Sequence, residues 1–179
     1  MLINILIGIA VVIIVFLMIA ATRPEDFRVS RSATFSAPPE VVFPLVNDFH
    51  NWEAWSPWAK IDPAVKNTFS GPISGKGAGF AWSGNNKVGE GRMTITESRP
   101  SELILIKLEF LRPFKATNTT EFTFKPQGGQ TLVSWTMSGK NNFMAKAFSI
   151  FMDCEKMVGP QFEQGLTQMK AVAEATVKA

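Results

Sequence analysis

The sequence predicts an α+β protein in which a curved antiparallel sheet of about seven strands wraps around a long C-terminal helix, with one transmembrane helix in front. Three observations support this prediction. Residues 2–21 form an apolar run without a charged side chain. Between residues 27 and 138, apolar and polar residues alternate with a period of two, which is typical of half-buried strands. Residues 142–179 return to the spacing of an amphipathic helix.

The apolar run, LINILIGIAVVIIVFLMIAA, is long enough to cross a membrane, because about 20 residues at roughly 1.5 Å per residue span about 30 Å. A cleaved signal peptide is the alternative. It would need a basic residue before the run, a shorter run and a small-x-small cleavage site. This run begins at Leu2 and ends in Ile19-Ala20-Ala21. We therefore expect a retained, single-pass anchor in the cell membrane.

The charges around the run predict its orientation. Arg23, Arg28 and Arg31 follow the run, and no Lys or Arg precedes it. The flank that carries the basic residues normally stays in the cytoplasm. We therefore expect residues 2–21 to be a transmembrane anchor, residues 22–26 a short linker, and residues 27–176 a cytoplasmic domain.

The domain opens with a strand and a short helix. In FRVSRSATFSA (residues 27–37), apolar and polar side chains alternate until Pro38-Pro39 ends the strand. Pro39 suits the first turn of a helix, which continues to about Val46. This helix runs into HNWEAWSPWA (residues 50–59), where Pro57 prevents regular continuation. That stretch contains three of the five tryptophans and the single histidine of the chain.

Residues 64–138 have the pattern of successive strands in an antiparallel meander. Gly84-Asn85-Asn86 and Gln127-Gly128-Gly129 are typical of hairpin turns. One parity of these strands is apolar and the other carries Thr, Ser, Lys and Glu, so one face of the sheet is expected to be buried.

The C-terminal segment is predicted to be one long helix that covers this apolar face. Apolar residues recur at helical intervals from Met144 to Ala173. Gly159-Pro160 interrupts the pattern, because proline removes a backbone donor and clashes with the preceding turn. We therefore expect the helix to be kinked or broken near residue 159.

The order of strand, short helices, six-strand meander and long helix is that of the helix-grip fold. Residues 27–58, FRVSRSATFSAPPEVVFPLVNDFHNWEAWSPW, resemble the opening of the polyketide cyclase/dehydrase-like branch of the START-related superfamily called SRPBCC. Asp48, Trp52 and Trp55 fill the places of its Asp-x-x-x-W-x-x-W segment. The similarity continues through VGEGRMTITES (88–98), TLVSWTMSG (131–139) and GPQFEQGLTQMK (159–170). The resemblance implies that apolar small molecules are bound or transformed between sheet and helix.

Composition argues against several other classes of protein. The chain is 46% apolar and only 18% charged, which is not the composition of a disordered protein. A net charge of +3 without a basic run gives no footprint for nucleic acid. Cys154 is the single cysteine, so neither an intrachain disulfide nor a cysteine zinc cluster is expected. We expect no metal and no cofactor, and the oligomeric state is open.

The candidate ligand-binding residues are the aromatic, Met and Ile side chains expected on the inner face of the sheet and on the helix. Methionine and aromatic side chains suit a cavity that accepts varied apolar shapes. The alternative is that the same residues simply fill the core. The candidates are Trp52, Trp55, Phe80, Trp82, Met93, Ile106, Phe110, Phe122, Phe124, Trp135, Met137, Phe148, Met152 and Phe162.

The sequence offers little for catalysis. It contains no HExxH, GxSxG or CxxC motif. His50, Asp48 and Glu97 are weak candidates for acid-base roles, and for each of them a solvated position is the alternative. The three tryptophans after the first helix have three possible roles: core at the helix–sheet junction, a wall of the ligand cavity, or contact with the membrane surface.

The function that fits these patterns is a membrane-anchored binding protein for a hydrophobic small molecule or lipid-like ligand, held between the sheet and the C-terminal helix. The first alternative is a cyclase- or hydrolase-like enzyme on the same fold. The second is a membrane-tethered interaction module without a ligand. The pattern of residues does not name the ligand.

Overall fold

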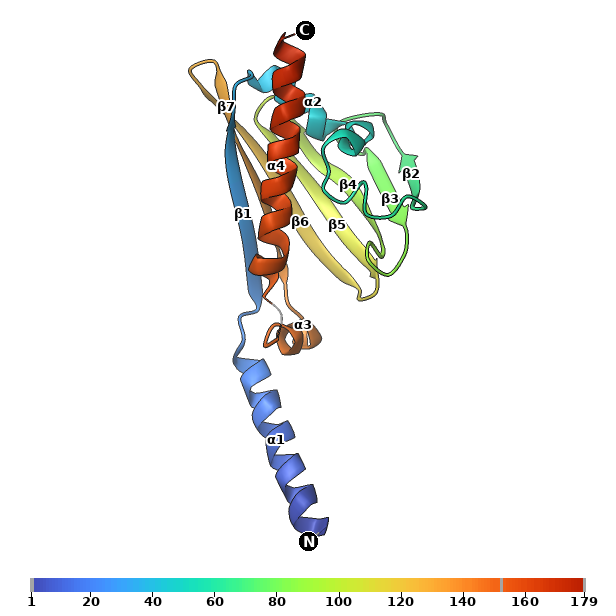
Figure 1. Cartoon of the computed structure of the whole chain (residues 1–179), viewed down its shortest axis with the longest axis vertical. Helices are drawn as coiled ribbons and strands as arrows, with labels where there is room; N and C mark the ends of the chain where they lie inside the picture. Colours follow the sequence, from blue (N-terminus) through green and yellow to red (C-terminus); the bar gives the residue numbers. More distant parts are fainter. Residues whose placement is uncertain (1, 152, 179) are drawn as a thin grey trace.

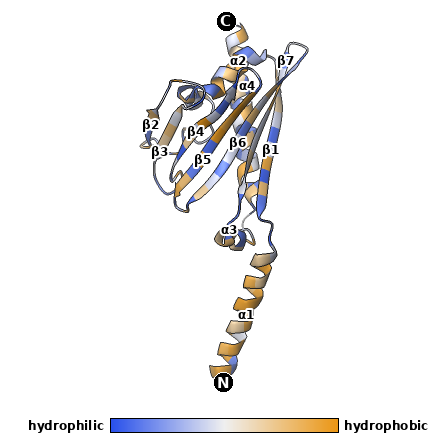
Figure 2. Ribbon diagram, turned by 180° about the vertical axis from the view of Figure 1, so that it is seen from behind, coloured by the Kyte–Doolittle hydropathy of each residue, from blue (hydrophilic) through white to orange (hydrophobic). Residues whose placement is uncertain are grey.

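The computed structural model describes residues 2–151 and 153–178. Helix α1 (Leu2–Thr22) projects from the folded domain (Figure 1), and its surface is almost uniformly hydrophobic (Figure 2). Its side chains are exposed apart from those of Phe16 and Ala20. By length and composition α1 is able to cross a membrane, and a signal sequence near the N-terminus meets the same criteria.

The domain contains one antiparallel sheet in the order β1-β7-β6-β5-β4-β3-β2. Strands β2 to β7 form a meander, and β1 joins the edge that β7 would otherwise leave open (Figure 1). This confirms the predicted sheet and the helix-grip order of elements. The strands are β1 (Asp26–Phe35), β2 (Lys66–Ser70), β3 (Gly79–Ser83), β4 (Glu90–Arg99), β5 (Leu103–Arg112), β6 (Ala116–Gln127) and β7 (Gln130–Lys140).

The helices divide one face of the sheet between them. The long helix α4 (Cys154–Lys178) lies over the side formed by β1, β7 and β6, and strands β2 to β4 extend beyond it (Figure 1). Helix α2 (Pro39–Asn47) and the 3-10 turn η1 (Phe49–Ala54) lie near the end of the sheet that is remote from α1 (Figure 1). The short helix α3 (Phe143–Phe148) lies at the opposite end, beside α1. We call the face toward α4 the inner face.

The C-terminal helix, which we expected to be kinked or broken near residue 159, is not broken there. The C-terminal segment is interrupted earlier, between the end of α3 at Phe148 and the start of α4 at Cys154, and Gly159-Pro160 lie inside α4. A Cβ atom on Gly159 would lie against the guanidinium group of Arg31 on β1, which hydrogen bonds to α4 hold in place. Glycine lets the helix approach the strand at this point.

Arg31 connects α4 to the sheet on both sides of that glycine. Its Nε donates to Glu163 (2.6 Å) and its Nη1 donates to Glu155 (2.5 Å), four residues to either side of Gly159. These hydrogen bonds raise the pKa of Arg31 above its ordinary value, the bond to Glu163 contributing most. Such pairs near the surface contribute little to the free energy of folding. Their role here is to join α4 to β1 at a defined place.

Stacked aromatic rings fill the space under the middle of α4. Trp135 of β7 lies 4.0 Å from Phe162 of α4 and 4.9 Å from Phe122 of β6, measured between ring centroids. A Cβ atom on Gly165 would come within 2.7 Å of the Trp135 ring, so this part of α4 also needs a glycine. The indole N–H of Trp135 is buried and has no hydrogen-bond partner among the described residues. The core of the domain therefore lies between α4 and the β7–β6 part of the sheet.

Candidate ligand-binding site

Part of the predicted ligand set forms this packed core. Trp52 and Trp55 are buried, and their rings lie edge-on to Phe122 and Trp135. The Nε1 atom of Trp52 donates to the carbonyl of Val46 (3.0 Å), and that of Trp55 donates to Leu45 (2.8 Å). These bonds join the loop after α2 to the last turn of α2, so both tryptophans lie at the junction of helix and sheet.

A second group of aromatic side chains lies on the inner face beyond α4. Phe69, Phe80, Trp82 and Phe110 follow one another across β2, β3 and β5, with centroid separations of 5.4, 6.1 and 6.1 Å. The ring of His50 stacks on Phe69 at 4.0 Å and extends the row. We call these five residues the aromatic strip. Phe80, Trp82 and Phe110 are half-buried and Phe69 is exposed, so the strip offers apolar surface to a ligand.

The local sequence fixes the orientation of Trp82. Gly91 pairs with Trp82 on the adjacent strand, and a Cβ atom there would come within 2.5 Å of the indole ring. The absence of a side chain at Gly91 lets the ring lie close to β4. The indole N–H donates to the carbonyl of Val88 (3.0 Å). The polar group of Trp82 is therefore satisfied, and the exposed part of its ring is apolar.

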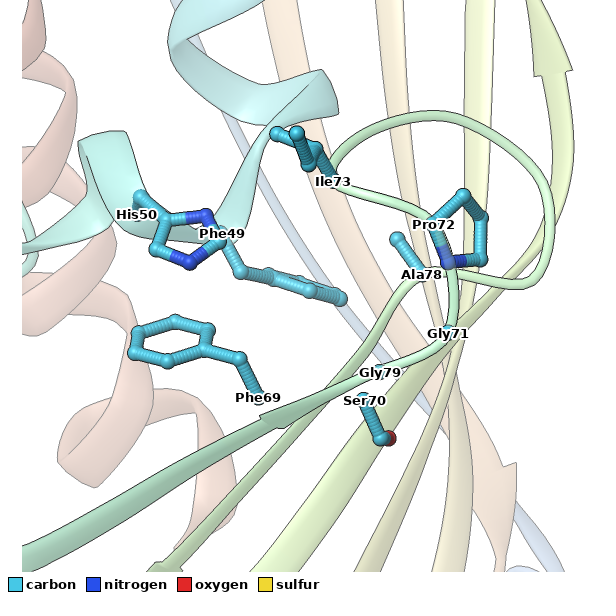
Figure 3. Close-up of a pocket in the computed structure, with 9 residues that line it drawn as sticks. All are labelled: Phe49, His50, Phe69, Ser70, Gly71, Pro72, Ile73, Ala78 and Gly79. Atoms are coloured by element: carbon cyan, nitrogen blue, oxygen red, sulfur yellow. The ribbon is translucent and has the colours of Figure 1, made fainter.

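One end of the strip forms the wall of a pocket of about 210 Å³. His50 and Phe69 lie on one side of this pocket, and Pro72 and Ile73 lie on the other (Figure 3). The loop that carries Pro72 turns at Gly71, whose φ of +74° is strained for any other residue. Phe49 also lines the pocket. A pocket of this size is large enough for one end of an apolar molecule.

The sequence pattern did not identify Phe49, Phe69, Pro72 or Ile73. Phe69 is the only large apolar residue of β2, a strand of five exposed residues, so no alternation reveals its inward direction. Its register shows that direction, because Phe69 pairs with Phe80 and Phe80 pairs with the buried Met93. Such pairing depends on the neighbouring strand and leaves no signal in the local sequence.

The two candidates for acid-base chemistry near this pocket touch each other. The Oδ1 atom of Asp48 lies 2.7 Å from Nδ1 of His50 and also accepts from the backbone N–H of His50 (2.9 Å). Asp48 thereby caps η1 and orients the imidazole. The one hydroxyl group among the lining residues, that of Ser70, points away from His50 (Figure 3). The pocket thus contains an oriented imidazole, and no hydroxyl group of its lining residues is directed at it.

Glu97, the third such candidate, lies on the other face of the sheet. A β-bulge between Ile95 and Glu97 leaves Thr96 without a partner, which reverses the alternation along β4. The Glu97 carboxylate therefore faces outward, 3.1 Å from Arg99. The bulge turns Ser98 inward instead, where its hydroxyl donates to the Asn47 side chain (2.7 Å). Glu97 is separated from His50 and Asp48 by the sheet.

A second pocket, of about 340 Å³, lies at the other end of the strip. Phe110 lines it together with Glu109, Lys115 and Asn142. A bidentate contact from Arg92 and a second contact from Lys107 lower the pKa of Glu109 to about 2, so this carboxylate is ionised at neutral pH. This pocket is therefore more polar than the first.

The remaining predicted residues lie in three places. Met93, Ile106, Phe124 and Met137 are buried on the inner face. Phe148 of α3 is exposed and contacts Phe114 rather than the sheet (centroids 5.2 Å apart), and Met152 lies outside the described residues. The structure also places two buried polar residues, Asn118 and Thr120, on the inner face of β6 beside Met137. The first half of β6 is rich in polar residues, so its sequence did not predict that these two are buried.

Metal chemistry has no framework in the part of the chain that the structure describes. No three or more His, Cys, Asp or Glu side chains come together there in an arrangement that could hold a metal ion. Cys154 is half-buried, and burial raises the pKa of its thiol. The described site therefore offers apolar and aromatic contacts.

The fold matches several solved structures along most of their length. An aromatase/cyclase, Zhui, from Streptomyces sp. R1128 superposes with a TM-score of 0.63 at 13% identity, covering 86% of this chain and 97% of that one. A protein of unknown function from Staphylococcus aureus gives 0.62 at 12% identity, with 87% and 98% coverage. A protein from Mesorhizobium loti gives 0.62 at 17% identity, with 84% and 98% coverage. At these identities the likeness concerns the fold alone.

These matches define a helix-grip fold, to which this chain adds an N-terminal apolar helix. The sequence profile of the family described as polyketide cyclase/dehydrase and lipid transport matches residues 26–174, most of the chain. The chain belongs to this family. No curated protein matches it in sequence.

Proposed function

We propose that the protein is a membrane-anchored binding protein for an apolar small molecule or lipid-like ligand, and that the aromatic strip contacts this ligand. One observation carries the proposal: α4 covers one side of the inner face, and the aromatic rings of β2, β3 and β5 remain partly exposed beyond it. Contiguous exposed apolar surface is uncommon on folded proteins, and where it occurs it often marks a binding site.

The packing of the core supports a site beside α4 rather than beneath it. Trp135, Phe162 and Phe122 occupy the space under the helix, so a ligand there would have to displace them. The strip is accessible without such a rearrangement. The ligand site is thus shifted along the inner face from the position that the sequence suggested.

The size and chemistry of the strip favour an elongated apolar ligand. The pocket at His50, about 210 Å³, is smaller than the roughly 300–1,000 Å³ of sites that enclose a drug-sized molecule. One end of the ligand would enter this pocket and the rest would lie along Phe80, Trp82 and Phe110. Burial of about 300 Å² of apolar ligand surface gives roughly 7 kcal/mol before the cost of association, which is compatible with micromolar affinity.

Helix α1 supports the anchored form of the proposal. A helix of 21 residues, in which only Asn4 and Thr22 are polar and nearly all side chains are exposed, needs an apolar surrounding, and a bilayer provides one of the right thickness. The basic residues that follow α1 favour a cytoplasmic domain. The family description, which includes lipid transport, is consistent with an apolar ligand.

Titration with an apolar fluorescent probe tests the site. The domain from residue 23 to 179 is suitable, because its core cluster includes no residue of α1. We expect Trp82→Ala to weaken probe binding about tenfold, which corresponds to about 1.4 kcal/mol of lost contact. Trp58→Ala is the matched control: Trp58 is also partly exposed, but it contacts Trp135 and Phe162 instead of the strip. Equal losses in both variants, or no binding by the parent domain, would contradict the proposal.

An enzymatic role is the second candidate, and the contact between Asp48 and His50 at the pocket rim favours it. An aspartate that orients a histidine is the usual support for a general base. With a candidate substrate in hand, His50→Ala should lower turnover at saturating substrate about 10²-fold or more if the histidine is the base. A smaller effect on turnover would remove this candidate.

A further inference from the structure

We propose that α3 and the turn between β5 and β6 form a membrane-docking surface that holds the base of the domain in the bilayer interface. The surface consists of Phe114 in the turn and of Phe143, Met144, Phe148 and Phe151 in and after α3. We call these five residues the basal patch. The inference rests on the anchoring by α1 that is part of the proposed function.

The exposure of the basal patch is unexplained within the folded chain. The side chains of Phe114 and Phe151 are 63% and 76% exposed, and the other three are between 42% and 60% exposed. Phe114 and Phe148 contact each other, which joins the β5–β6 turn to α3. Clustered aromatic and methionine side chains of this kind are costly in water and favourable in the interfacial region of a membrane.

The position of Phe151 relative to α1 identifies the partner. Phe151 stacks on Phe16 of α1, with ring centroids 6.0 Å apart. Phe16 lies six residues before the end of α1 at Thr22, which is about 9 Å along the helix axis at roughly 1.5 Å per residue. If α1 spans the bilayer up to its C-terminal end, Phe151 therefore lies below that end, at a depth where the surroundings are lipid.

The connection between α1 and the domain prevents the basal patch from leaving this level. Only residues 23–25 separate α1 from β1. The backbone N–H of Asn141, just before α3, donates to the carbonyl of Glu25 (2.7 Å). The side-chain amide of Asn141 donates to the carbonyl of Pro24 (3.4 Å). The linker is thus hydrogen-bonded to the segment that leads into α3.

The cations near the basal patch fit a lipid surface. Lys115 follows Phe114 in the β5–β6 turn, and Arg23 directly follows α1. Basic side chains next to apolar ones are typical of segments that lie in the interface of a membrane with anionic lipids. The bilayer therefore explains the exposed rings, their level relative to α1 and the adjacent charges together.

Spin labels on the full chain in vesicles of phosphatidylcholine and phosphatidylglycerol test the inference. The native thiol is first removed by Cys154→Ser, or by Cys154→Ala if the serine variant does not fold. Single cysteines are then introduced by Phe148→Cys, Phe151→Cys, Val12→Cys and Ile73→Cys, each at an exposed side chain. Each label is compared for its collision rates with oxygen, which concentrates in lipid, and with a water-soluble nickel chelate.

We expect the ratio of oxygen to nickel collisions at positions 148 and 151 to be several-fold higher than at position 73. Ile73 is the matched control, because it is as exposed as Phe151 but belongs to the pocket loop far from α1. The label at position 12 reports on the anchor itself. If position 12 is in lipid but positions 148 and 151 resemble position 73, the docking surface is wrong and the anchor stands. If position 12 is in water, the anchor and the docking surface both fail. Protection of positions 148 and 151 from both reagents would indicate a protein partner, such as a second copy, and would also overturn the inference.

Discussion

Two tryptophans on the inner face, Trp135 and Trp82, have the same parity and different surroundings. Trp135 lies between Phe122 and Phe162 under α4, and it is 2% exposed. Trp82 has protein on one side of its ring and is partly open on the other. The loss of a ring costs the contacts that it makes and the cavity that it leaves, so the two positions should differ in their effect on stability.

We expect Trp135→Ala to lower the free energy of unfolding by about 3–5 kcal/mol and Trp82→Ala by about 1–3 kcal/mol. Urea unfolding of the domain from residue 23 to 179 measures both. Trp135→Phe is the control, since it keeps a ring in the stack and removes the indole N–H that has no partner. It should cost less than Trp135→Ala. Equal costs for the two alanine variants would mean that Trp82 is as well packed as Trp135.

For single residues, the sequence predicted which face of the sheet most side chains take. It failed where contacts with another segment of the chain decide the face. Alternation placed Met93, Ile106 and Trp135 correctly on the inner face. It could not show that Thr96 is a bulge, because an extra residue leaves the same letters in the same order. It also could not show that Trp82 would remain open while Trp135 is covered, since that depends on where α4 lies.

The position of α4 depends on two glycines, each beneath a large side chain of the sheet. Gly159 faces Arg31 of β1, and Gly165 faces Trp135 of β7. A glycine inside a helix is less favourable than alanine by about 1 kcal/mol, so both residues lower the intrinsic stability of α4. The close approach of helix and sheet offsets this cost.

Gly165→Ala is therefore expected to destabilise the domain, although the same change in an exposed helix would stabilise it. The new methyl group would lie 2.7 Å from the Trp135 ring, and overpacking of this kind costs about 1–3 kcal/mol. Thr167→Ala, two residues later on the exposed side of α4, is the control and should be neutral or slightly stabilising. Thermal unfolding of the two variants measures the difference. A higher melting temperature for Gly165→Ala would show that α4 can move away without loss.

These glycines also explain why the helix break was predicted in the wrong place. In sequence, Gly159-Pro160 has the composition of a helix end. In the structure, the glycine serves the contact with Arg31, and the chain turns instead between Phe148 and Cys154. The strands were easier to predict, because each short run of alternating residues is bounded by turn residues such as Gly128-Gly129, both of which have positive φ.

For the whole molecule, the proposed membrane anchor and its orientation are the properties that most affect the proposed function. An alkaline phosphatase or green fluorescent protein reporter fused to the C-terminus tests both. We expect fluorescence and no phosphatase activity, because the basic residues after α1 favour the cytoplasmic side, and we expect the full chain to stay in the membrane after a high-salt wash. Phosphatase activity, or a mature N-terminus near Thr22, would contradict the prediction.

The family and the overall fold could be predicted from the sequence, whereas the site could be predicted only in part. The order of elements and the segment from Asp48 to Trp55 were sufficient for the fold. The strip required the register of β2 against β3 and the limits of α4, which arise from contacts between distant segments. Phe148 illustrates the difference. Its helical spacing suggested that it lines the ligand cavity, but its contact with Phe114 places it at the base of the domain.

The three-residue connection between α1 and β1 has a consequence for how a ligand would be found. In the proposed anchored form, the domain would be held close to the bilayer and would sample a thin layer of solution and the lipid surface beneath it. An apolar compound partitions into that layer, so its local concentration there can exceed its concentration in the bulk cytoplasm by orders of magnitude. Even an affinity in the micromolar range would then suffice for occupancy. A binding protein anchored in this way would respond to what the membrane contains, and an equally good binder released from α1 would not.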